Sequence, residues 1–168
     1  MSADPDLIAQ ALGLHFHQLG IVVRDIEMAA AAHKGLGPWT TYTYDRSVVP
    51  GLCLAGKSAD FAFRLAFNQR QPQLEFIQPL DERSPYSEWL SRHGPGLHHL
   101  GFFVDDFARS VELMKSMGYE PFMSGSGFGA DGSGAYAYFD TAADLGYFVE
   151  AIQPPAVRRP PESVLFAK

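Results

Sequence analysis

The sequence repeats itself once, and this repeat limits the architectures open to the chain more than any other feature does. The segment from His17 to Gly37, HQLGIVVRDIEMAAAAHKGLG, aligns without a gap on the segment from His98 to Gly118, HHLGFFVDDFARSVELMKSMG. A second pair of segments, LEFIQP at 74–79 and VEAIQP at 149–154, closes each copy. The offsets of the two alignments are similar, so both belong to one duplicated unit.

Each copy predicts the same order of elements, βαβββ. It opens with a short β-rich run and an aspartate, Asp25 or Asp106, in position to cap a helix. Glycines then end the helical pattern before three further strand-like segments. The expected elements lie in chain order at 19–23, 26–34, 39–44, 61–67 and 74–78 in the first copy, and at 100–104, 107–117, 121–124, 135–140 and 147–153 in the second.

The repeat also predicts the organisation of the whole chain. We expect a short helix in the connector, through Trp89 and Leu90, that ends at His93 and Gly94. The predicted segments are an N-terminal extension at 1–15, a first unit at 16–80, a connector at 81–96, a second unit at 97–153 and a C-terminal tail at 154–168.

Two loop-like segments remain outside this pattern. The glycine-rich stretch 125–134 lies between predicted strands and lacks the Lys-Ser/Thr and following helix of a phosphate-binding loop, so we interpret it as a flexible hairpin or lid. The proline-rich tail after Gln153 is expected to run over the surface or onto a neighbouring subunit.

Composition and charge narrow the classes of partner. The net charge of -6 gives no cationic excess for binding nucleic acid or anionic lipid. Cys53 is the only cysteine, which excludes an internal disulfide. Asp4 and Asp6 lie where a signal peptide would carry Lys or Arg, and no apolar run approaches the length of a bilayer span. We therefore expect a cytoplasmic protein that binds neither nucleic acid nor membrane.

A tandem βαβββ repeat that opens on a histidine motif and closes on a glutamate resembles the vicinal oxygen chelate superfamily. This superfamily includes glyoxalases, bleomycin-resistance proteins, extradiol dioxygenases and methylmalonyl-CoA epimerases. The stretch PGLHHLGFFVDD at 95–106 is most similar to the epimerase branch, and the resemblance extends over about 16–153. It implies an α+β fold in which the two units form an open, cup-like mixed β-sheet with helices packed outside, and it implies a homodimer.

The resemblance also implies one divalent metal ion, held by the first and last strand of each unit. Carried over residue by residue, the ligands are Gln18, Glu75, His99 and Glu150. Strand alternation supports this set, because Gln18 and Gly20 share one face of their strand. An imidazole, carboxylates and an amide oxygen suit Fe²⁺, Mn²⁺, Co²⁺, Ni²⁺ or Zn²⁺.

Gln18 departs from the family, in which a histidine is usual at this position. A glutamine oxygen is a weaker donor than imidazole, so the site could hold its metal weakly or not at all. His17 is adjacent, and a β-bulge would exchange the two side chains. His17 and His98 are otherwise interpreted as packing or hydrogen-bonding residues of opposite strand parity. The remaining histidines are interpreted as surface or capping residues: His15, His33 and His93.

The leading functional hypothesis is a metal-dependent isomerase, epimerase or lyase that acts on a small oxygenated metabolite through an enolate-type intermediate, with Glu75 and Glu150 as catalytic residues. Methylmalonyl-CoA epimerase itself is disfavoured, because the family places a further glutamate within the stretch 48–64, which has none. One alternative is a metal-free protein of the bleomycin-resistance type that binds a small molecule in an aromatic cup. Another is a non-haem iron dioxygenase, which would need a second histidine.

Overall fold

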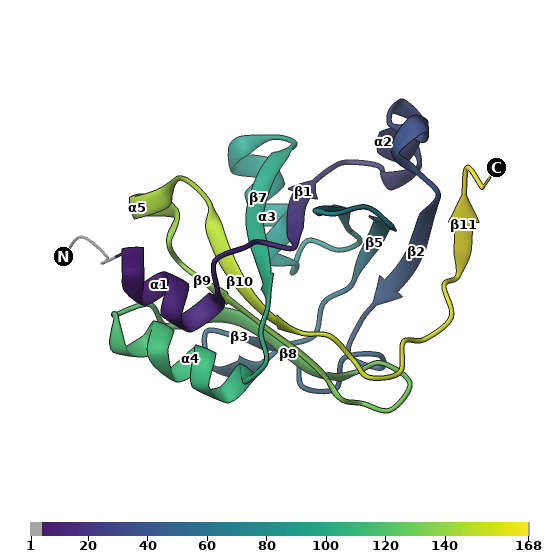
Figure 1. Ribbon diagram of the computed structural model, residues 1–168. Helices are drawn as coiled ribbons and strands as arrows, with labels where there is room; N and C mark the ends of the chain where they lie inside the picture. The colour runs from purple at the N-terminus through teal and green to yellow at the C-terminus, as the bar shows by residue number, and fades with distance from the viewer. Residues whose placement is uncertain (1–4, 168) are drawn as a thin grey trace.

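The computed structural model describes residues 5–167, and for Pro5 and Asp6 only the backbone. The first four residues of the predicted N-terminal extension, with Asp4, and the last residue of the tail lie outside the described residues. The described chain forms one open mixed β-sheet flanked by α-helices (Figure 1). This confirms the predicted α+β fold class. Within residues 5–167 no helix is long and apolar enough to cross a membrane.

Both copies of the repeat fold in the predicted order. The first copy contains β1 (Gln18–Val22), α2 (Ile26–Ala32), β2 (Trp39–Tyr44), β5 (Phe63–Asn68) and β6 (Gln73–Pro79). The second contains β7 (Gly96–Phe103), α4 (Phe107–Ser116), β8 (Pro121–Phe128), β9 (Gly134–Phe139) and β10 (Phe148–Gln153). The connector holds α3 (Pro85–His93), which ends at Gly94 as predicted.

The sheet order brings the ends of the two copies together. Its strands follow the order β11-β2-β5-β6-β1-β7-β10-β9-β8-β3-β4. At the centre β1 and β7 pair antiparallel, while β6 lies parallel to β1 and β10 lies parallel to β7. The four central strands are therefore the first and last strands of the two copies, which carry all four predicted ligands.

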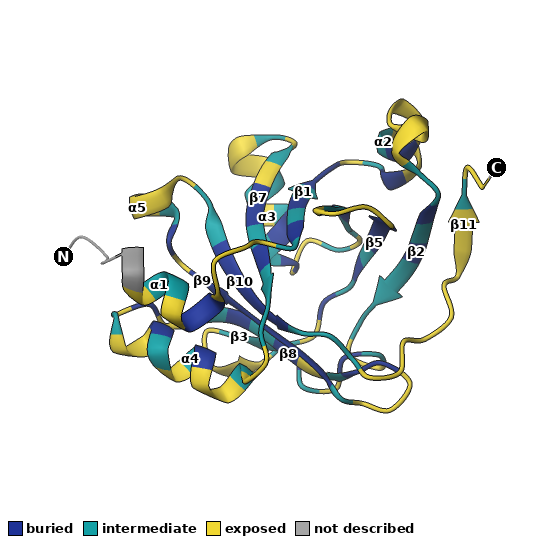
Figure 2. Ribbon diagram, viewed as in Figure 1, coloured by how far each residue is buried: buried dark blue, intermediate teal, exposed yellow. Residues whose placement is uncertain are grey.

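The two faces of the curved sheet have separate cores. On the outer face α2 packs through Ile26 and Ala30 on the first copy, and α4 packs through Met114 on the second. The inner face carries a third core that includes Val22 and Ile77. Figure 2 shows the buried faces of the strands against the exposed outer sides of the helices. The predicted alternation of β1 is confirmed, with Val22 toward the inside of the cup.

The helix caps are also confirmed. The side chain of Asp25 accepts a hydrogen bond from the backbone N–H of Met28 at 2.8 Å, and that of Asp106 accepts one from Arg109 at 3.0 Å. Each cap satisfies a backbone donor that the first turn of a helix leaves unpaired, which stabilises the helix by about 1 kcal/mol. The caps fix where α2 and α4 begin, and therefore where each copy of the repeat crosses back over the sheet.

Several elements were not predicted. They are α1 (Pro5–Leu12), the hairpin of β3 (Cys53–Leu54) and β4 (Lys57–Ser58), the short 3₁₀ turn Lys34–Leu36, α5 (Ala142–Leu145) and β11 (Ser163–Leu165). Helix α1 lies on α4 (Figure 1). The glycine-rich stretch is shorter as a loop than predicted, because β8 continues to Phe128. The tail folds back onto its own chain, where β11 pairs antiparallel with β2.

Candidate metal centre

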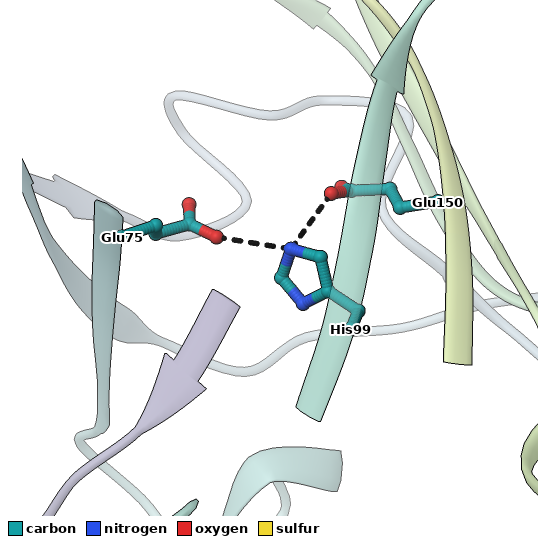
Figure 3. A group of neighbouring side chains, drawn as sticks. All are labelled: Glu75, His99 and Glu150. Atoms are coloured by element: carbon teal, nitrogen blue, oxygen red, sulfur yellow. Dashed lines mark ion pairs between the residues drawn. The ribbon is translucent and has the colours of Figure 1, made fainter. Parts of the chain in front are cut away.

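Three predicted ligands meet at the centre of the sheet. The Nε2 atom of His99 lies 3.2 Å from Oε2 of Glu75 and 3.0 Å from Oε2 of Glu150. Figure 3 shows the two carboxylates approaching the imidazole from either side, from β6 and β10, with His99 on β7 between them. The three candidate ligand atoms all lie within 4.8 Å of one another.

The strand register explains this convergence. Gly20 on β1 pairs with Glu75 on one side and with His99 on the other. One row along, Gly101 on β7 pairs with Gln18 on one side and with Glu150 on the other. Residues that pair across a sheet share a face. All four predicted ligands therefore lie on the inner face, in two adjacent rows.

The glycine within the first row makes room for the histidine. A Cβ atom built on Gly20 would overlap the imidazole ring of His99, so the ring occupies the space that any other residue at position 20 would fill. The two rows are related by the repeat, because Gly101 is equivalent to Gly20 and Gln18 is equivalent to His99. A Cβ atom on Gly101 would lie 3.1 Å from Oε1 of Gln18.

Burial leaves these ligand atoms with only one another as partners among the described residues. His99 is fully buried, and Glu75 and Glu150 are 5% and 4% exposed. Nε2 of His99, Oε2 of Glu75 and Oε2 of Glu150 form no hydrogen bond of normal geometry with the described residues. Three buried polar atoms without hydrogen bonds would each cost free energy, and a divalent cation bonded to all three would satisfy them together. The donor set and its burial therefore fit a divalent metal.

The electrostatics of the three groups are coupled. Burial alone would lower the pKa of His99, but the neighbouring carboxylates of Glu150 and Glu75 outweigh it and raise the pKa to about 9. Burial raises the pKa of Glu75, while His99 opposes that rise. Without a metal, a proton on His99 is thus the cation that balances the two acids. A metal ion would have to replace that proton.

Gln18 lies on the same inner face, in the row next to that of Glu75 and His99. It lines the same cavity, and its amide nitrogen donates a hydrogen bond to Oε1 of Gln73 at 2.9 Å. The donation directs the amide nitrogen toward Gln73, and the oxygen, which is the ligand atom, lies over Gly101. His17 instead stacks on Phe103 at 4.8 Å, and its Nδ1 accepts the backbone N–H of Phe103. This geometry favours Gln18 over His17 as a fourth ligand.

A bulge places a second histidine next to His99. The register between β1 and β7 shifts after the Gly20–His99 pair, so that Ile21 pairs with Leu97 and His98 is left over. Both His98 and His99 then contact the ring of Tyr138, with ring centroids 5.5 and 4.9 Å away. The expectation that His98 has the opposite parity is therefore wrong, although it packs among aromatic rings as predicted.

His98 contacts the candidate ligand directly. Its Nδ1 lies 3.1 Å from Nδ1 of His99. One of the two nitrogens must carry the hydrogen, and His99 needs its Nε2 free for a metal, so the matching tautomer has His99 Nδ1–H donating to His98. Burial, followed by the charge of His99, holds the pKa of His98 well below its usual value, which keeps it a neutral acceptor. Sequence analysis missed this contact.

The ligands lie at the wall of a cavity inside the cup. Its volume is about 80 Å³, which is room for roughly six water-sized groups. Aromatic side chains dominate its lining: Tyr42, Tyr44, Phe63, Phe67, Tyr86 and Tyr136. Four residues of the C-terminal tail also line it, namely Pro154, Pro155, Arg158 and Arg159. Sequence analysis placed the tail on the surface or on a neighbouring subunit and did not identify these contributions.

The other histidines have structural roles or none. His33 is the C-terminal cap of α2, and its Nδ1 lies 2.9 Å from the carbonyl oxygen of Ala29. His93 ends α3 and its ring lies 4.2 Å from that of Trp89. His15 is exposed. These positions agree with the surface or capping roles that were predicted.

Comparisons with known proteins place these findings in a family. Residues 17–139 match the model of the family described as Glyoxalase/Bleomycin resistance protein/Dioxygenase superfamily. No curated protein matches the chain. The predicted resemblance to this superfamily is confirmed by the family match.

The solved structures with similar folds include methylmalonyl-CoA epimerases. The enzyme from Mycobacterium tuberculosis aligns with a TM-score of 0.59 and 18% identity, over 86% of this chain and 90% of that one. A Streptomyces coelicolor methylmalonyl-CoA epimerase in complex with 2-nitronate-propionyl-CoA gives 0.62 and 15%, over 87% and 98%. A hypothetical protein from Bacillus halodurans gives 0.58 and 20%, over 86% and 97%. At these identities the similarity shows the fold alone.

Proposed function

The chain belongs to the glyoxalase/bleomycin resistance protein/dioxygenase superfamily, and from this premise we propose that it is a metal-dependent isomerase, epimerase or lyase. Its substrate is a small oxygenated metabolite, and its reaction passes through an enolate-type intermediate. The observation that carries the proposal is the convergence of three buried ligand atoms without hydrogen bonds, from Glu75, His99 and Glu150, at one cavity.

The proposed ligands are Glu75, His99 and Glu150, with the amide oxygen of Gln18 as the fourth. A divalent ion bound there would polarise a substrate carbonyl and acidify the adjacent C–H bond. The candidates are Fe²⁺, Mn²⁺, Co²⁺, Ni²⁺ and Zn²⁺, because a donor set of one imidazole and two carboxylates suits all of them.

The chain's own residues supply the proton transfer. A ligand glutamate that loosens from the metal, Glu75 or Glu150, would take the proton from carbon and return it at another position or on another face. The aromatic walls keep bulk water from the cavity, which strengthens the electrostatic interactions inside it. The cavity volume of about 80 Å³ suits the reacting part of a small acid or ketone rather than a large cofactor.

The methylmalonyl-CoA epimerase reaction fits this cavity poorly. The solved relatives bind ligands such as 2-nitronate-propionyl-CoA, but the only carboxylates among the described cavity-lining residues are Glu75 and Glu150, both proposed as ligands. The stretch that lacks the expected family glutamate forms the β3–β4 hairpin and places Leu52 and Phe61 in the inner core. A reaction that needs one base, such as an isomerisation or an elimination, agrees better with this lining.

One alternative has an observation in its favour. A metal-free binding protein of the bleomycin-resistance type would use the aromatic lining of the cavity to hold a ligand. The hydrogen bond from Gln18 to Gln73 is satisfied without a metal, which is compatible with that alternative. A non-haem iron dioxygenase is supported less, because the cavity brings a single histidine to the two carboxylates.

Elemental analysis tests the proposal. Wild-type protein purified without chelator or nickel resin, then incubated with each candidate metal and desalted, is compared with His99→Ala and Glu75→Ala. The matched controls are His15→Ala and Glu112→Ala, because both residues are exposed and remote from the cavity. We expect about one equivalent of metal in the wild type and in both controls. Both site variants should lose it.

The outcomes separate the two functions. If the wild type and the controls bind metal and the site variants do not, the metal-dependent enzyme is supported. Enolisable carbonyl compounds then become the substrates to screen. Absence of metal from the wild type under every loading condition rejects the proposal and leaves the binding protein. We also propose a cytoplasmic homodimer, as the sequence and the family resemblance imply, and light scattering on the purified protein tests the dimer.

A further inference from the structure

The C-terminal segment 154–165, called the strap below, crosses the mouth of the cup. In Figure 1 it leaves β10, passes the turn between β8 and β9, and rises to β11 at the far edge of the sheet. It thus joins the two copies of the repeat across the cup. Four of its residues line the cavity, and two of these are arginines, Arg158 and Arg159.

The strap is held at both ends. Near its start, the backbone N–H of Ala130 donates to the carbonyl oxygen of Val157 at 2.8 Å, and that of Ala156 donates to Oγ of Ser133 at 2.8 Å. Near its end, Glu162 accepts hydrogen bonds from the backbone N–H and the hydroxyl of Thr43 at 2.9 and 3.0 Å. The arginines therefore lie on a segment fixed on either side of them.

Prolines stiffen the same segment. Pro154 and Pro155 precede the arginines and Pro160 follows them directly. Each proline fixes its backbone φ angle, so the strap loses less conformational entropy when it is ordered. Gly129, at the β8–β9 turn, has a φ of +93° and would place a Cβ atom against Pro155, so the turn accommodates the strap closely.

The two guanidinium groups keep their charge without a carboxylate partner among the described residues. Within residues 5–167 neither Arg158 nor Arg159 forms an ion pair with a carboxylate. Arg159 donates from Nε to the carbonyl oxygen of Gly129, at 3.4 Å. Both arginines face the cavity closely enough to lower the pKa of Tyr44, although burial and Glu75 raise that pKa to about 12 overall.

Inside the cavity a further polar group lacks a partner. Tyr136 is 6% exposed and lines the cavity, and its hydroxyl forms no hydrogen bond with the described residues. Burial raises its pKa well above the usual value, so the hydroxyl stays protonated and can donate. A buried donor without a partner is costly unless a ligand completes it.

We infer that the substrate is a small organic anion, whose carboxylate or phosphate group binds Arg158 and Arg159 at the mouth while its reactive end lies against Glu75, His99 and Glu150. The cavity is cationic at its mouth and acidic at its inner wall. A substrate with one anionic end is oriented by this arrangement, because its charge is attracted to the arginines and repelled by the carboxylates. Tyr136 donates to an oxygen between the two ends. This inference rests on the proposed function for the identity of the reactive end only.

The test measures binding of simple anions to the whole protein. Calorimetric titrations of Mn²⁺-loaded protein use malonate, succinate and glutarate, which separate two carboxylates by increasing lengths, and phosphoglycolate, in which phosphate replaces one carboxylate. The wild type is compared with the double variant Arg158→Gln/Arg159→Gln. The matched control is Arg24→Gln/Arg109→Gln, which removes the same charge at exposed positions that do not line the cavity.

We expect the best diacid or phosphoglycolate to bind the wild type about tenfold or more tightly than the Arg158→Gln/Arg159→Gln variant. The control should stay within about twofold of the wild type, since screened distant charges contribute little. Arg158→Lys/Arg159→Lys should keep much of the affinity, because the charge remains. The preference between phosphoglycolate and the diacids identifies the anionic group. Tyr136→Phe should bind the preferred anion more weakly than the wild type does.

Equal affinity in the wild type and the Arg158→Gln/Arg159→Gln variant overturns the inference, as does failure of all four anions to bind the wild type. Metal content is measured in every variant and should not change. If the wild type takes up no metal, the proposed function fails, but the same titrations on the metal-free protein still decide whether the arginines bind an anion. The two failures are therefore distinguishable.

Discussion

The imidazole of His99 lies across Gly20, in the space that a side chain at position 20 would occupy. The repeat-equivalent relationship joins Gln18 and Gly101, where the amide oxygen of Gln18 lies over the second glycine. Each copy of the repeat thus supplies a ligand position from its first strand and a glycine that accommodates the ligand of the other copy. The motif that opens each unit is explained by this exchange at the β1–β7 contact.

Gly20→Ala should therefore weaken metal binding although no ligand residue is replaced. The added methyl group would force the His99 ring aside, and overpacking of this kind costs about 1–3 kcal/mol of stability. We expect a lower thermal midpoint and at least a tenfold loss of metal affinity, measured by competition with a chelator. Gly96→Ala is the control, since a Cβ atom there meets no heavy atom within 4 Å. Full metal binding by Gly20→Ala would contradict the assignment of His99 as a ligand.

A second prediction concerns the contact between His98 and His99. His98→Phe keeps an aromatic ring among its neighbours but removes the acceptor for His99 Nδ1. Partners that orient a metal ligand are typically worth 10–100-fold in metal affinity, and we expect a loss in that range. The free energy of unfolding should change by less than about 1.5 kcal/mol, because the packing volume is nearly kept.

The control for this variant is His17→Phe. It removes the hydrogen bond that the backbone N–H of Phe103, on β7, donates to the ring nitrogen Nδ1 of His17, just before β1. Its stability should fall by about 1 kcal/mol while its metal affinity stays unchanged. If His98→Phe and His17→Phe weaken metal binding equally, His98 acts on the site only through general stability, and the orienting contact is refuted.

Much of the fold could be predicted from the sequence, because the repeat indicates which distant segments have the same structure. The predicted strand at 39–44 coincides with β2, and both helix caps were identified from one aspartate each. The rows of ligands follow from strand alternation, which holds over β1. These features depend on local sequence pattern and on the equivalence of the two copies, and both are visible in the sequence itself.

The missed features depend on contacts between distant segments. Helix α1 is short and amphipathic, and its stability comes from packing on α4. Strand β11 spans three residues that acquire strand geometry by pairing with β2. The bulge at His98 breaks the alternation that sequence reasoning assumed, and nothing in the local pattern indicates it. The arginines of the strap reach the cavity because of that distant pairing, so tail composition alone could not identify them.

A third prediction exploits the departure at Gln18. Gln18→His would replace the amide with an imidazole, and imidazole is the stronger donor. We expect metal affinity to rise by about tenfold, or ~1.4 kcal/mol, despite the loss of the hydrogen bond to Gln73. Chelator competition measures the change, with Gln18→Ala and His17→Ala alongside. A loss of metal in His17→Ala, with no gain in Gln18→His, would show that His17 is the fourth ligand.

The last prediction concerns the pH dependence of metal binding. The pKa of His99 in the metal-free protein is raised from 6.5 to about 9, and only the neutral imidazole can bind a metal. Below about pH 9 the metal must displace a proton, so apparent affinity should rise about tenfold per pH unit and level off above that pH. In the metal-free protein the same shift has the opposite sign for folding. The stability that protonated His99 contributes is complete below about pH 6.5 and is lost as the pH rises through about 9.

Calorimetry in buffers of different ionisation enthalpy measures the protons directly. Near neutral pH we expect about one proton released for each Mn²⁺ bound, because protonated His99 loses its Nε2 proton when the metal binds and keeps the proton on Nδ1. The Gly96→Ala variant should release the same number, since it leaves the site intact. Affinity that does not change between neutral pH and pH 9, with no proton released, would mean that His99 is neutral between the two carboxylates.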